Sequence, residues 1–244
     1  MRVAKAIAHA GLCSRRDAEA WIAAGRVAVN GTVLKTPAHV VSPSDTITVD
    51  DEPLPQPQAP RLWRYHKPKG LVTSHKDPQG RKTVFDALPQ SLPRVVSVGR
   101  LDINTEGLLL LTNDGALARH LELPSTGWVR RYRVRAHGRV TQQALDALKS
   151  GVTIDGVRYG PVDAKVERQQ GSNVWLTISL REGKNREVKR IAEYLGLTVN
   201  RLIRVSFGPF ALGELAPGAV DEVKRKVLVE QLGTQLSRDL GVKR

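Results

Sequence analysis

The chain has 244 residues, of which 38 are Lys or Arg and 24 are Asp or Glu, so its formal net charge is +14 at pH 7. A hydrophobic content of 41% supports a folded core and excludes a disordered basic tail. The single cysteine excludes a disulfide framework, and no two of the six histidines have metal-ligand spacing, so we expect no metal site. The charge favours a polyanionic partner, with nucleic acid ahead of an anionic membrane surface.

Nothing in the sequence predicts a membrane-spanning segment. The longest apolar run is the four leucines of residues 108–111, far shorter than a bilayer requires. Charged residues recur through the first 26 positions and exclude an apolar signal segment. We therefore expect a cytoplasmic protein without membrane contact, and the absence of a coiled-coil repeat predicts a monomer.

A proline-rich stretch divides the chain. Residues 51–62 read DEPLPQPQAPRL, and their four prolines favour an extended, semi-rigid spacer over a helix. This pattern predicts a small domain at 1–50, a linker at 51–62 and a larger domain at 63–240.

The first 50 residues contain signals for two short helices and a few strands. An apolar helical stripe at 3–8 is closed by Gly11, and Ser14-Arg15-Arg16-Asp17 fits a capping box that opens a second helix. Asn30-Gly31 is the preferred turn of a two-residue hairpin, and a last strand is expected at 46–49. Together these signals predict a small α/β module.

The rest of the chain has the mixed pattern of an α+β domain. In 130–136 apolar residues alternate with arginines, which predicts a strand whose side chains alternate between two faces. Asn185 is expected to cap a helix that ends at Gly196, and 221–240 to form a terminal helix with Val223, Val227 and Leu228 inward. Further strands are expected at 94–98, 108–112, 174–180 and 199–205, and further helices at 116–123 and 141–148.

Basic residues are concentrated in a few segments. Residues 130–139 hold five arginines and no acid, and residues 181–204 hold seven Lys or Arg against three Glu. Cations on one strand face and at helix N-termini suit phosphate groups. Because aromatic residues make up only 5% of the chain, we expect contacts to structured RNA or DNA and no extended stacking platform.

The segment 99–107, GRLDINTEG, lies between two apolar segments and places Asp102 near Arg100. One interpretation is a catalytic loop, in which a neighbouring cation keeps the carboxylate ionised. The other is a tight Asx-type turn that only joins two strands. Residue spacing alone leaves both open.

The amino-acid sequences of these segments resemble those of a known family. GRLDINTEGLLLLTNDG at 99–115 resembles the signature of the bacterial ribosomal RNA pseudouridine synthases that modify single uridines. The SRRDAEAWI and GRVAVNG segments of the small module resemble the RNA-binding domain of ribosomal small-subunit protein S-four. The resemblance extends from about residue 1 to about residue 230, and further segments that resemble family motifs lie at 66–88, 130–134, 181–196 and 202–218.

The resemblance implies a fold and a reaction. The fold is α+β, with a catalytic domain on a mixed, mainly antiparallel β-sheet with flanking helices and a small N-terminal α/β RNA-binding domain. The reaction is an aspartate-dependent isomerisation of a flipped uridine to pseudouridine in ribosomal RNA, without a cofactor. RLIRVSFGPFALGEL resembles the large-subunit branch of the family and favours 23S RNA. The alternatives are 16S RNA, a non-catalytic ribosome-assembly factor, and, on charge alone, a DNA-binding or membrane-surface protein.

The resemblance also implies roles for four residues. Asp102 is the essential carboxylate, which attacks the sugar, attacks the base or deprotonates the sugar. Tyr132 stacks on the flipped uracil, Lys189 pairs with Asp102, and Leu202 forms a wall of the uracil pocket.

A second set of residues is expected to contact RNA. Arg15 and Arg16 lie on the RNA face of the small domain, and Arg100 contacts RNA or fills the space of the flipped base. Arg186 and Arg190 are expected to share a helix face. The remaining predicted RNA contacts are Lys184 and Asn185 at the start of that helix, and Arg131, which stands where the family often has Lys.

Overall fold

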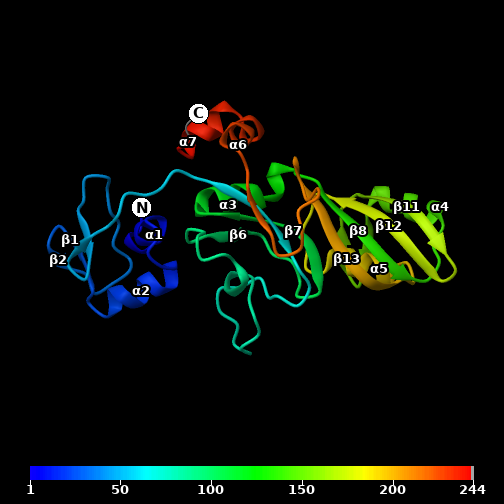
Figure 1. Ribbon diagram of the computed structural model, residues 1–244, viewed down its shortest axis with the longest axis horizontal. Helices are drawn as coiled ribbons and strands as arrows, with labels where there is room; N and C mark the ends of the chain where they lie inside the picture. Colours follow the sequence, from blue (N-terminus) through cyan, green and yellow to red (C-terminus); the bar gives the residue numbers. More distant parts are fainter. Residues whose placement is uncertain (243–244) are drawn as a thin grey trace.

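The computed structural model describes residues 1–242 and contains two main sheets (Figure 1). A four-stranded sheet near the N-terminus has the order β2-β1-β3-β4. A nine-stranded sheet has the path β11-β12-β8-β13-β7-β5-β15, with β14 added to β13 and β6 added to β7. A separate hairpin joins β9 to β10. The α+β fold class predicted from the sequence is confirmed.

The N-terminal module has the local features that its sequence predicts. The Ser14 hydroxyl accepts from the Asp17 N–H, and the Asp17 carboxylate accepts from the Ser14 N–H, which completes the capping box. Asn30 and Gly31 both have positive φ, as a two-residue hairpin requires. Its elements are α1 (Val3–His9), α2 (Arg15–Ala23), β1 (Val27–Val29), β2 (Thr32–Val33), β3 (Ile47–Val49) and β4 (Glu52–Pro53).

The large sheet is antiparallel between all its described neighbours except β7 and β13, which run parallel. Strand β8 shows the predicted alternation, with Tyr132, Val134 and Ala136 buried between exposed arginines. The strands are β5 (Leu62–Lys67), β6 (Val96–Val98), β7 (Thr105–Thr112), β8 (Arg130–His137), β9 (Val152–Ile154), β10 (Val157–Tyr159), β11 (Val162–Gln170), β12 (Asn173–Leu180), β13 (Thr198–Phe207), β14 (Phe210–Ala211) and β15 (Val220–Glu222).

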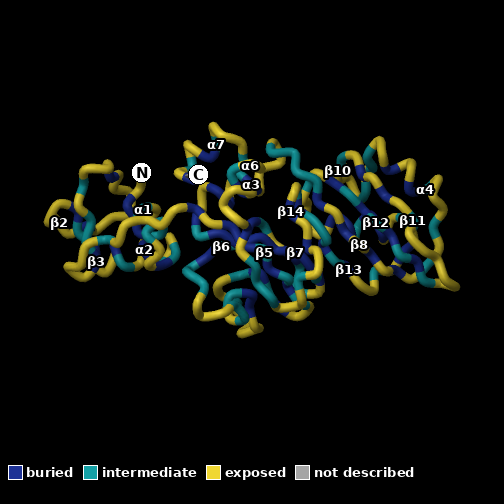
Figure 2. The backbone as a smooth tube through the Cα atoms, turned by 45° about the horizontal axis from the view of Figure 1, so that its top comes forward, coloured by how far each residue is buried: buried dark blue, intermediate teal, exposed yellow. Residues whose placement is uncertain are grey.

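Strand β7 is covered on both of its faces. The leucines at 108–111 all have 0% exposure. Leu109 and Leu111 belong to one hydrophobic cluster, whereas Leu108 and Leu110 belong to another on the opposite face. Figure 2 shows buried backbone along β5 and β7, in contrast to the largely exposed β2. A continuous apolar run is typical of a strand buried on both faces.

Helices supply the cover on each face. Helix α3 and helix α6 contribute Leu117, Leu121 and Leu228 to the cluster around Leu108. Helix α5 contributes Val188 and Ile191 to the cluster around Leu109. The helices of this part are α3 (Gly115–Glu122), α4 (Gln142–Asp146), α5 (Glu187–Tyr194), α6 (Arg225–Leu232) and α7 (Thr234–Asp239), with 3-10 turns at Phe85–Ala87, Pro124–Thr126 and Ala147–Ser150.

The structure corrects the predicted terminal helix at 221–240. Residues 220–222 form strand β15, and two short helices follow, separated at Gly233 with φ of 80°. Val223 and Leu228 are buried as predicted, but Val227 is 39% exposed, so that part of the prediction is wrong. Pairing of β15 with β5, which makes β15 the edge strand of the sheet, removes residues 220–222 from any helix.

The start of helix α5 also differs from the prediction. Arg186, and not Asn185, occupies the N-cap position, and its left-handed φ of 52° places it outside the regular helix. The Glu187 carboxylate accepts from the Lys184 N–H and thereby holds the turn that precedes the helix. Arg186 and Arg190 therefore do not share a helix face as predicted, because only Arg190 lies within the helix.

Two polar contacts connect the N-terminal module to the large sheet region. His9 Nε2 lies 3.0 Å from Asp114 Oδ2, and Lys76 Nζ lies 3.6 Å from Asp17 Oδ1. Of the predicted spacer 51–62, Glu52–Pro53 pairs with β3, and 54–61 has no regular secondary structure. Among the helices of residues 1–242, none combines the length and apolar character needed to cross a membrane.

Candidate active site

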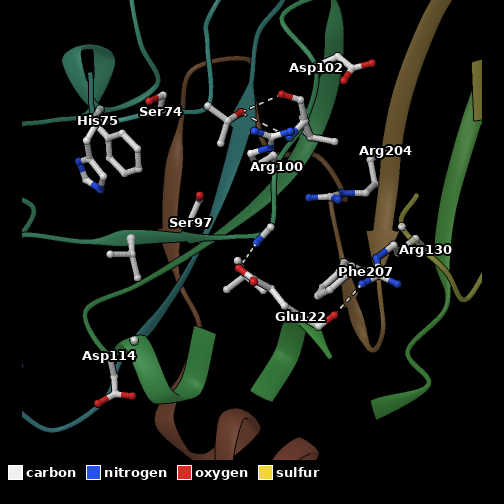
Figure 3. Close-up of a pocket in the computed structure, with 18 of the residues that line it drawn as sticks. Ser74, His75, Ser97, Arg100, Asp102, Asp114, Glu122, Arg130, Arg204 and Phe207 are labelled. Carbon is white, nitrogen blue, oxygen red and sulfur yellow. Dashed lines mark hydrogen bonds between the residues drawn. The ribbon is translucent and has the colours of Figure 1, made fainter. Parts of the chain in front are cut away.

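A cavity of about 1610 Å³ extends from the N-terminal module to the loop between β6 and β7. Its wall includes Arg15 and Arg16 at one end and Asp102 with Lys189 at the other. Figure 3 shows Asp102, Arg100 and Arg204 around one part of this cavity. Several cations and few aromatic rings line the wall, which suits an anionic ligand.

Asp102 lies on the loop between β6 and β7, and its carboxylate forms an ion pair with Lys189 of α5. Lys189 Nζ lies 3.0 Å from Asp102 Oδ2, although the two residues are 87 positions apart in the chain. The Asp102 side chain is 34% exposed, whereas Lys189 is only 13% exposed. The carboxylate is thus paired with a nearly buried cation and can still be reached by a ligand. The loop is shorter than the predicted 99–107 because β7 begins at Thr105.

A buried lysine at the end of β5 holds this loop by hydrogen bonds to its backbone. Lys67 has 0% exposure, and its Nζ donates to the backbone carbonyls of Asp102, Ile103 and Thr105 at 3.2, 3.2 and 2.9 Å, and to that of Pro68 at 3.1 Å. Burial lowers the pKa of Lys67 from 10.5 to about 8, while the Asp102 carboxylate acts in the opposite direction. At neutral pH the ammonium form therefore predominates and fixes the backbone that carries Asp102.

Gly107 permits the parallel pairing that completes the site. Its φ is +102°, and a Cβ atom there would lie 2.3 Å from the Arg204 carbonyl oxygen on β13. Only glycine allows the two backbones to approach this closely. The pairing sets Leu202 opposite Thr105 and so places β13 beside the Asp102 loop.

Tyr132 and Leu202 lie on the same face of the sheet, on neighbouring strands. Tyr132 pairs in register with Arg204, two positions after Leu202, and side chains two apart share a face. Both residues are more than nine-tenths buried, and both line the cavity. The structure thus brings together Asp102, Tyr132, Lys189 and Leu202, the four residues singled out by the sequence.

The predicted RNA-contacting residues divide into two groups. Six of them line the cavity, namely Arg15, Arg16, Arg100, Lys184, Asn185 and Arg186. Arg131 and Arg190 do not line it. Arg131 is exposed on the other face of β8, and its Nε lies 3.5 Å from the Ser179 hydroxyl.

Sequence reasoning did not single out Lys67, Arg130 or Arg204, all of which are buried. The alternation that places Tyr132 inward also places Arg130 inward, and the same period places Arg204 with Leu202. A cation on the buried face of an alternating strand is the signal that would have identified both arginines. Lys67 carries the same signal, because it continues the alternation of the buried Trp63 and Tyr65 on β5.

Comparison with known proteins identifies the class. The family model for RNA pseudouridylate synthase matches residues 61–194, and the S4 domain model matches residues 1–47. An RNA pseudouridine synthase of Rickettsia felis is 51% identical over 227 residues, which cover 93% of this chain and 98% of that protein. The chain belongs to the RNA pseudouridine synthase family, so it is an isomerase with an N-terminal S4 domain, and the resemblance seen in its sequence is confirmed.

Two further relatives extend this comparison. Ribosomal large subunit pseudouridine synthase B of Pseudomonas aeruginosa is 42% identical, with 95% of this chain and 62% of that protein covered. A crystal structure of a pseudouridylate synthase superposes with a TM-score of 0.65 at 30% identity and covers 96% of this chain and 100% of that one.

Proposed function

We propose that this enzyme isomerises a specific uridine of 23S ribosomal RNA to pseudouridine, with residues 63–240 as the catalytic domain. Residues 1–50 act as the RNA-binding domain, and 51–62 link the two. The observation that carries the proposal is the Asp102–Lys189 pair at 3.0 Å in a cavity shared with Tyr132 and Leu202. Similarity to ribosomal large subunit pseudouridine synthase B supports the choice of RNA, and an RNA substrate supports a cytoplasmic location.

The reaction is an isomerisation, so atoms and charge balance within the substrate. The bond between C1′ and N1 of uridine breaks, the uracil rotates, and a bond forms between C1′ and C5. The proton on C5 leaves and N1 gains a proton. In this scheme the Asp102 carboxylate begins the reaction as nucleophile or base, and Lys189 pairs with it and orients it.

Tyr132 and Leu202 provide the binding site for the base. We propose that the target nucleotide leaves the RNA stack and that its uracil lies against these two side chains, which are buried on one face of the sheet. The surrounding apolar surface excludes water, which would otherwise hydrolyse the detached sugar. Lys67 holds the Asp102 backbone during these steps.

RNA binding in this proposal uses the cations along the cavity. Arg15 and Arg16 at the start of α2 hold RNA at one end, and Lys184, Asn185 and Arg186 hold it before α5. Arg100, next to Asp102, fills the space that the flipped base leaves. Arg131 and Arg190 contact RNA outside the cavity, and the enzyme acts as a monomer.

The test maps pseudouridine in ribosomal RNA from cells that lack the protein. The RNA is treated with a pseudouridine-specific carbodiimide and analysed by primer extension, and the cells are complemented with wild type, Asp102→Asn or Asp155→Asn. Asp155 is a matched control because it is an exposed turn residue between β9 and β10 with φ of 50°.

One primer-extension stop, which marks a pseudouridine in 23S RNA, should disappear in the deletion strain. It should return with wild type and with Asp155→Asn but not with Asp102→Asn. A stop lost from 16S RNA would move the substrate to the small subunit. Retention of all stops in the deletion strain would reject ribosomal RNA isomerisation and favour a non-catalytic assembly factor.

A further inference from the structure

Two arginines are buried in the wall of the cavity. Arg204 on β13 is 3% exposed and Arg130 on β8 is 9% exposed. Their guanidinium carbons lie 5.2 and 4.7 Å from the centre of the Phe207 ring, and Figure 3 shows both beside that ring. Because Arg204 and Tyr132 are in register on neighbouring strands, the two arginines share the sheet face that carries Tyr132.

The hydrogen bonds of these two side chains differ. Arg130 Nη1 donates to the backbone carbonyls of Arg181 and Glu182 at 2.6 and 3.2 Å, and its Nη2 donates to that of Glu122 at 3.4 Å. Arg204 Nε donates to the Leu108 carbonyl at 2.8 Å, but its buried Nη2 has no partner among residues 1–242. Arg130 is therefore fixed by backbone carbonyls, whereas the Nη2 group of Arg204 has no hydrogen-bond acceptor among the described residues.

Neither guanidinium forms an ion pair within the described chain. The nearby Glu122 carboxylate accepts from the Gly99 N–H, and that of Glu187 accepts from the Lys184 N–H. Burial raises the pKa of Glu187, and neither carboxylate lies within ion-pair distance of Arg130 or Arg204. Two buried cations without a paired anion are costly in free energy, so a ligand anion at this position is strongly favoured.

We propose that Arg204, braced by Arg130, binds the phosphodiester group that flanks the target uridine. The proposal rests on the proposed function, because it takes the RNA in the cavity as the source of the anion. Guanidinium groups bind phosphate oxygens through paired, charge-assisted hydrogen bonds, and the free Nη2 provides such a donor.

The uracil itself is a poorer occupant of this position. Its carbonyl oxygens are neutral, so a base contact would satisfy one donor and leave both buried charges uncompensated. The position also fits a phosphate, because Arg204 is in register with Tyr132 and lies two strand positions, or about 7 Å, beyond Leu202, and so borders the site proposed for the base. A nucleotide with its base against Leu202 and Tyr132 would thus have its backbone near Arg204.

The test uses the full-length protein and an RNA fragment that contains the uridine mapped above. The fragment is made with native linkages, or with one neutral methylphosphonate on the 5′ or the 3′ side of the target. Wild type is compared with Arg204→Gln and with Arg133→Gln. Arg133 is a matched control because it lies on β8, is 51% exposed and is paired with Glu167.

For wild type and Arg133→Gln, one of the two neutral linkages should lower kcat/KM by about tenfold or more. For Arg204→Gln, native and neutral linkages should react at the same rate, because the partner of the phosphate charge has been removed. If the losses from the variant and from the neutral linkage multiply independently, the proposal is overturned.

The comparison uses the ratio of kcat/KM on native and neutral linkages for each enzyme. A general loss of stability lowers both values equally and leaves this ratio unchanged. If Arg204→Gln does not fold, Arg204→Lys takes its place, and its penalty for the neutral linkage should be several-fold smaller than that of wild type. An unchanged penalty would overturn the proposal. If wild type modifies all three RNAs equally, the phosphate site is rejected while the proposed function stands, and if it modifies none, the proposed function itself fails.

Discussion

The N-terminal module and the large sheet region place their cationic side chains in opposite environments. In the small module, strands have two or three residues and Arg15 and Arg16 are exposed at the start of α2. In the large region, strands reach ten residues and Lys67, Arg130 and Arg204 are buried. Exposed cations act through a long-range field that salt screens, whereas buried cations act through fixed geometry.

This contrast suggests a division of labour. In the proposed function, the module with the small core and exposed arginines attracts and orients RNA, and the large sheet holds the reacting groups. Substitutions of buried cations should therefore change the chemical step or the folding energetics. Substitutions of exposed cations should change RNA affinity and its dependence on salt.

The largest effect is expected for Lys189→Met. The substitution removes the partner 3.0 Å from Asp102 while the helix and its apolar neighbours remain. The rate of pseudouridine formation under single-turnover conditions should fall by about 10²-fold or more, with little change in thermal unfolding. A rate within threefold of wild type would show that the ion pair is structural only.

Lys67→Met should alter both activity and the pH dependence of stability. The folded-state pKa of Lys67 is about 8 and the unfolded value 10.5, so the unfolded chain binds more protons between these pH values. The contribution of Lys67 to the free energy of unfolding should therefore rise by about 2 kcal/mol from pH 8 to pH 10.

Urea unfolding of both proteins at pH 8 and pH 10 measures this rise, which Lys67→Met should lack. The variant should also lose activity at pH 7.5, because a Met side chain cannot donate hydrogen bonds to the carbonyls of Asp102 and Ile103. If the free energy of unfolding changed equally with pH in the two proteins, the lowered pKa of Lys67 would be contradicted.

The double variant Arg15→Gln with Arg16→Gln should change RNA affinity and leave the chemical step intact. KM should rise by about tenfold at 0.1 M salt while kcat is retained. The slope of log affinity against log salt should become shallower by roughly one to two. A fall in kcat with unchanged KM would show that the small module takes part in catalysis.

The smallest effect is expected at the contact between the two regions. His9→Ala removes the partner of Asp114 but leaves both backbone N–H groups that Asp114 caps at the start of α3. The free energy of unfolding should fall by less than about 1 kcal/mol. Asp114→Ala, which also removes the cap, should cost about 1–2 kcal/mol in the same thermal unfolding measurement.

The sequence predicted much of the local structure correctly. The capping box at Ser14, the Asn30-Gly31 hairpin and the alternation of β8 each depend on residues that are near neighbours in the chain. It failed at the Asn185 cap and in the terminal helix, where Arg186 adopts a left-handed conformation and residues 220–222 pair with β5. The strand at 220–222 depends on pairing with a segment more than 150 residues away, which a local pattern cannot predict.

The sequence by itself therefore determined the charge, the helical and strand periodicities and the motif that carries Asp102. Only the tertiary structure decided that β7 and β13 pair in parallel, that the Lys67 ammonium donates to the carbonyls of the Asp102 loop, and that Arg204 and Arg130 lie beside one Phe207 ring. Local patterns follow from short-range sterics and hydrogen bonding, which a few adjacent residues specify. The pairing of distant strands follows from the burial of apolar surface by the whole chain, and that burial sets which charged groups meet.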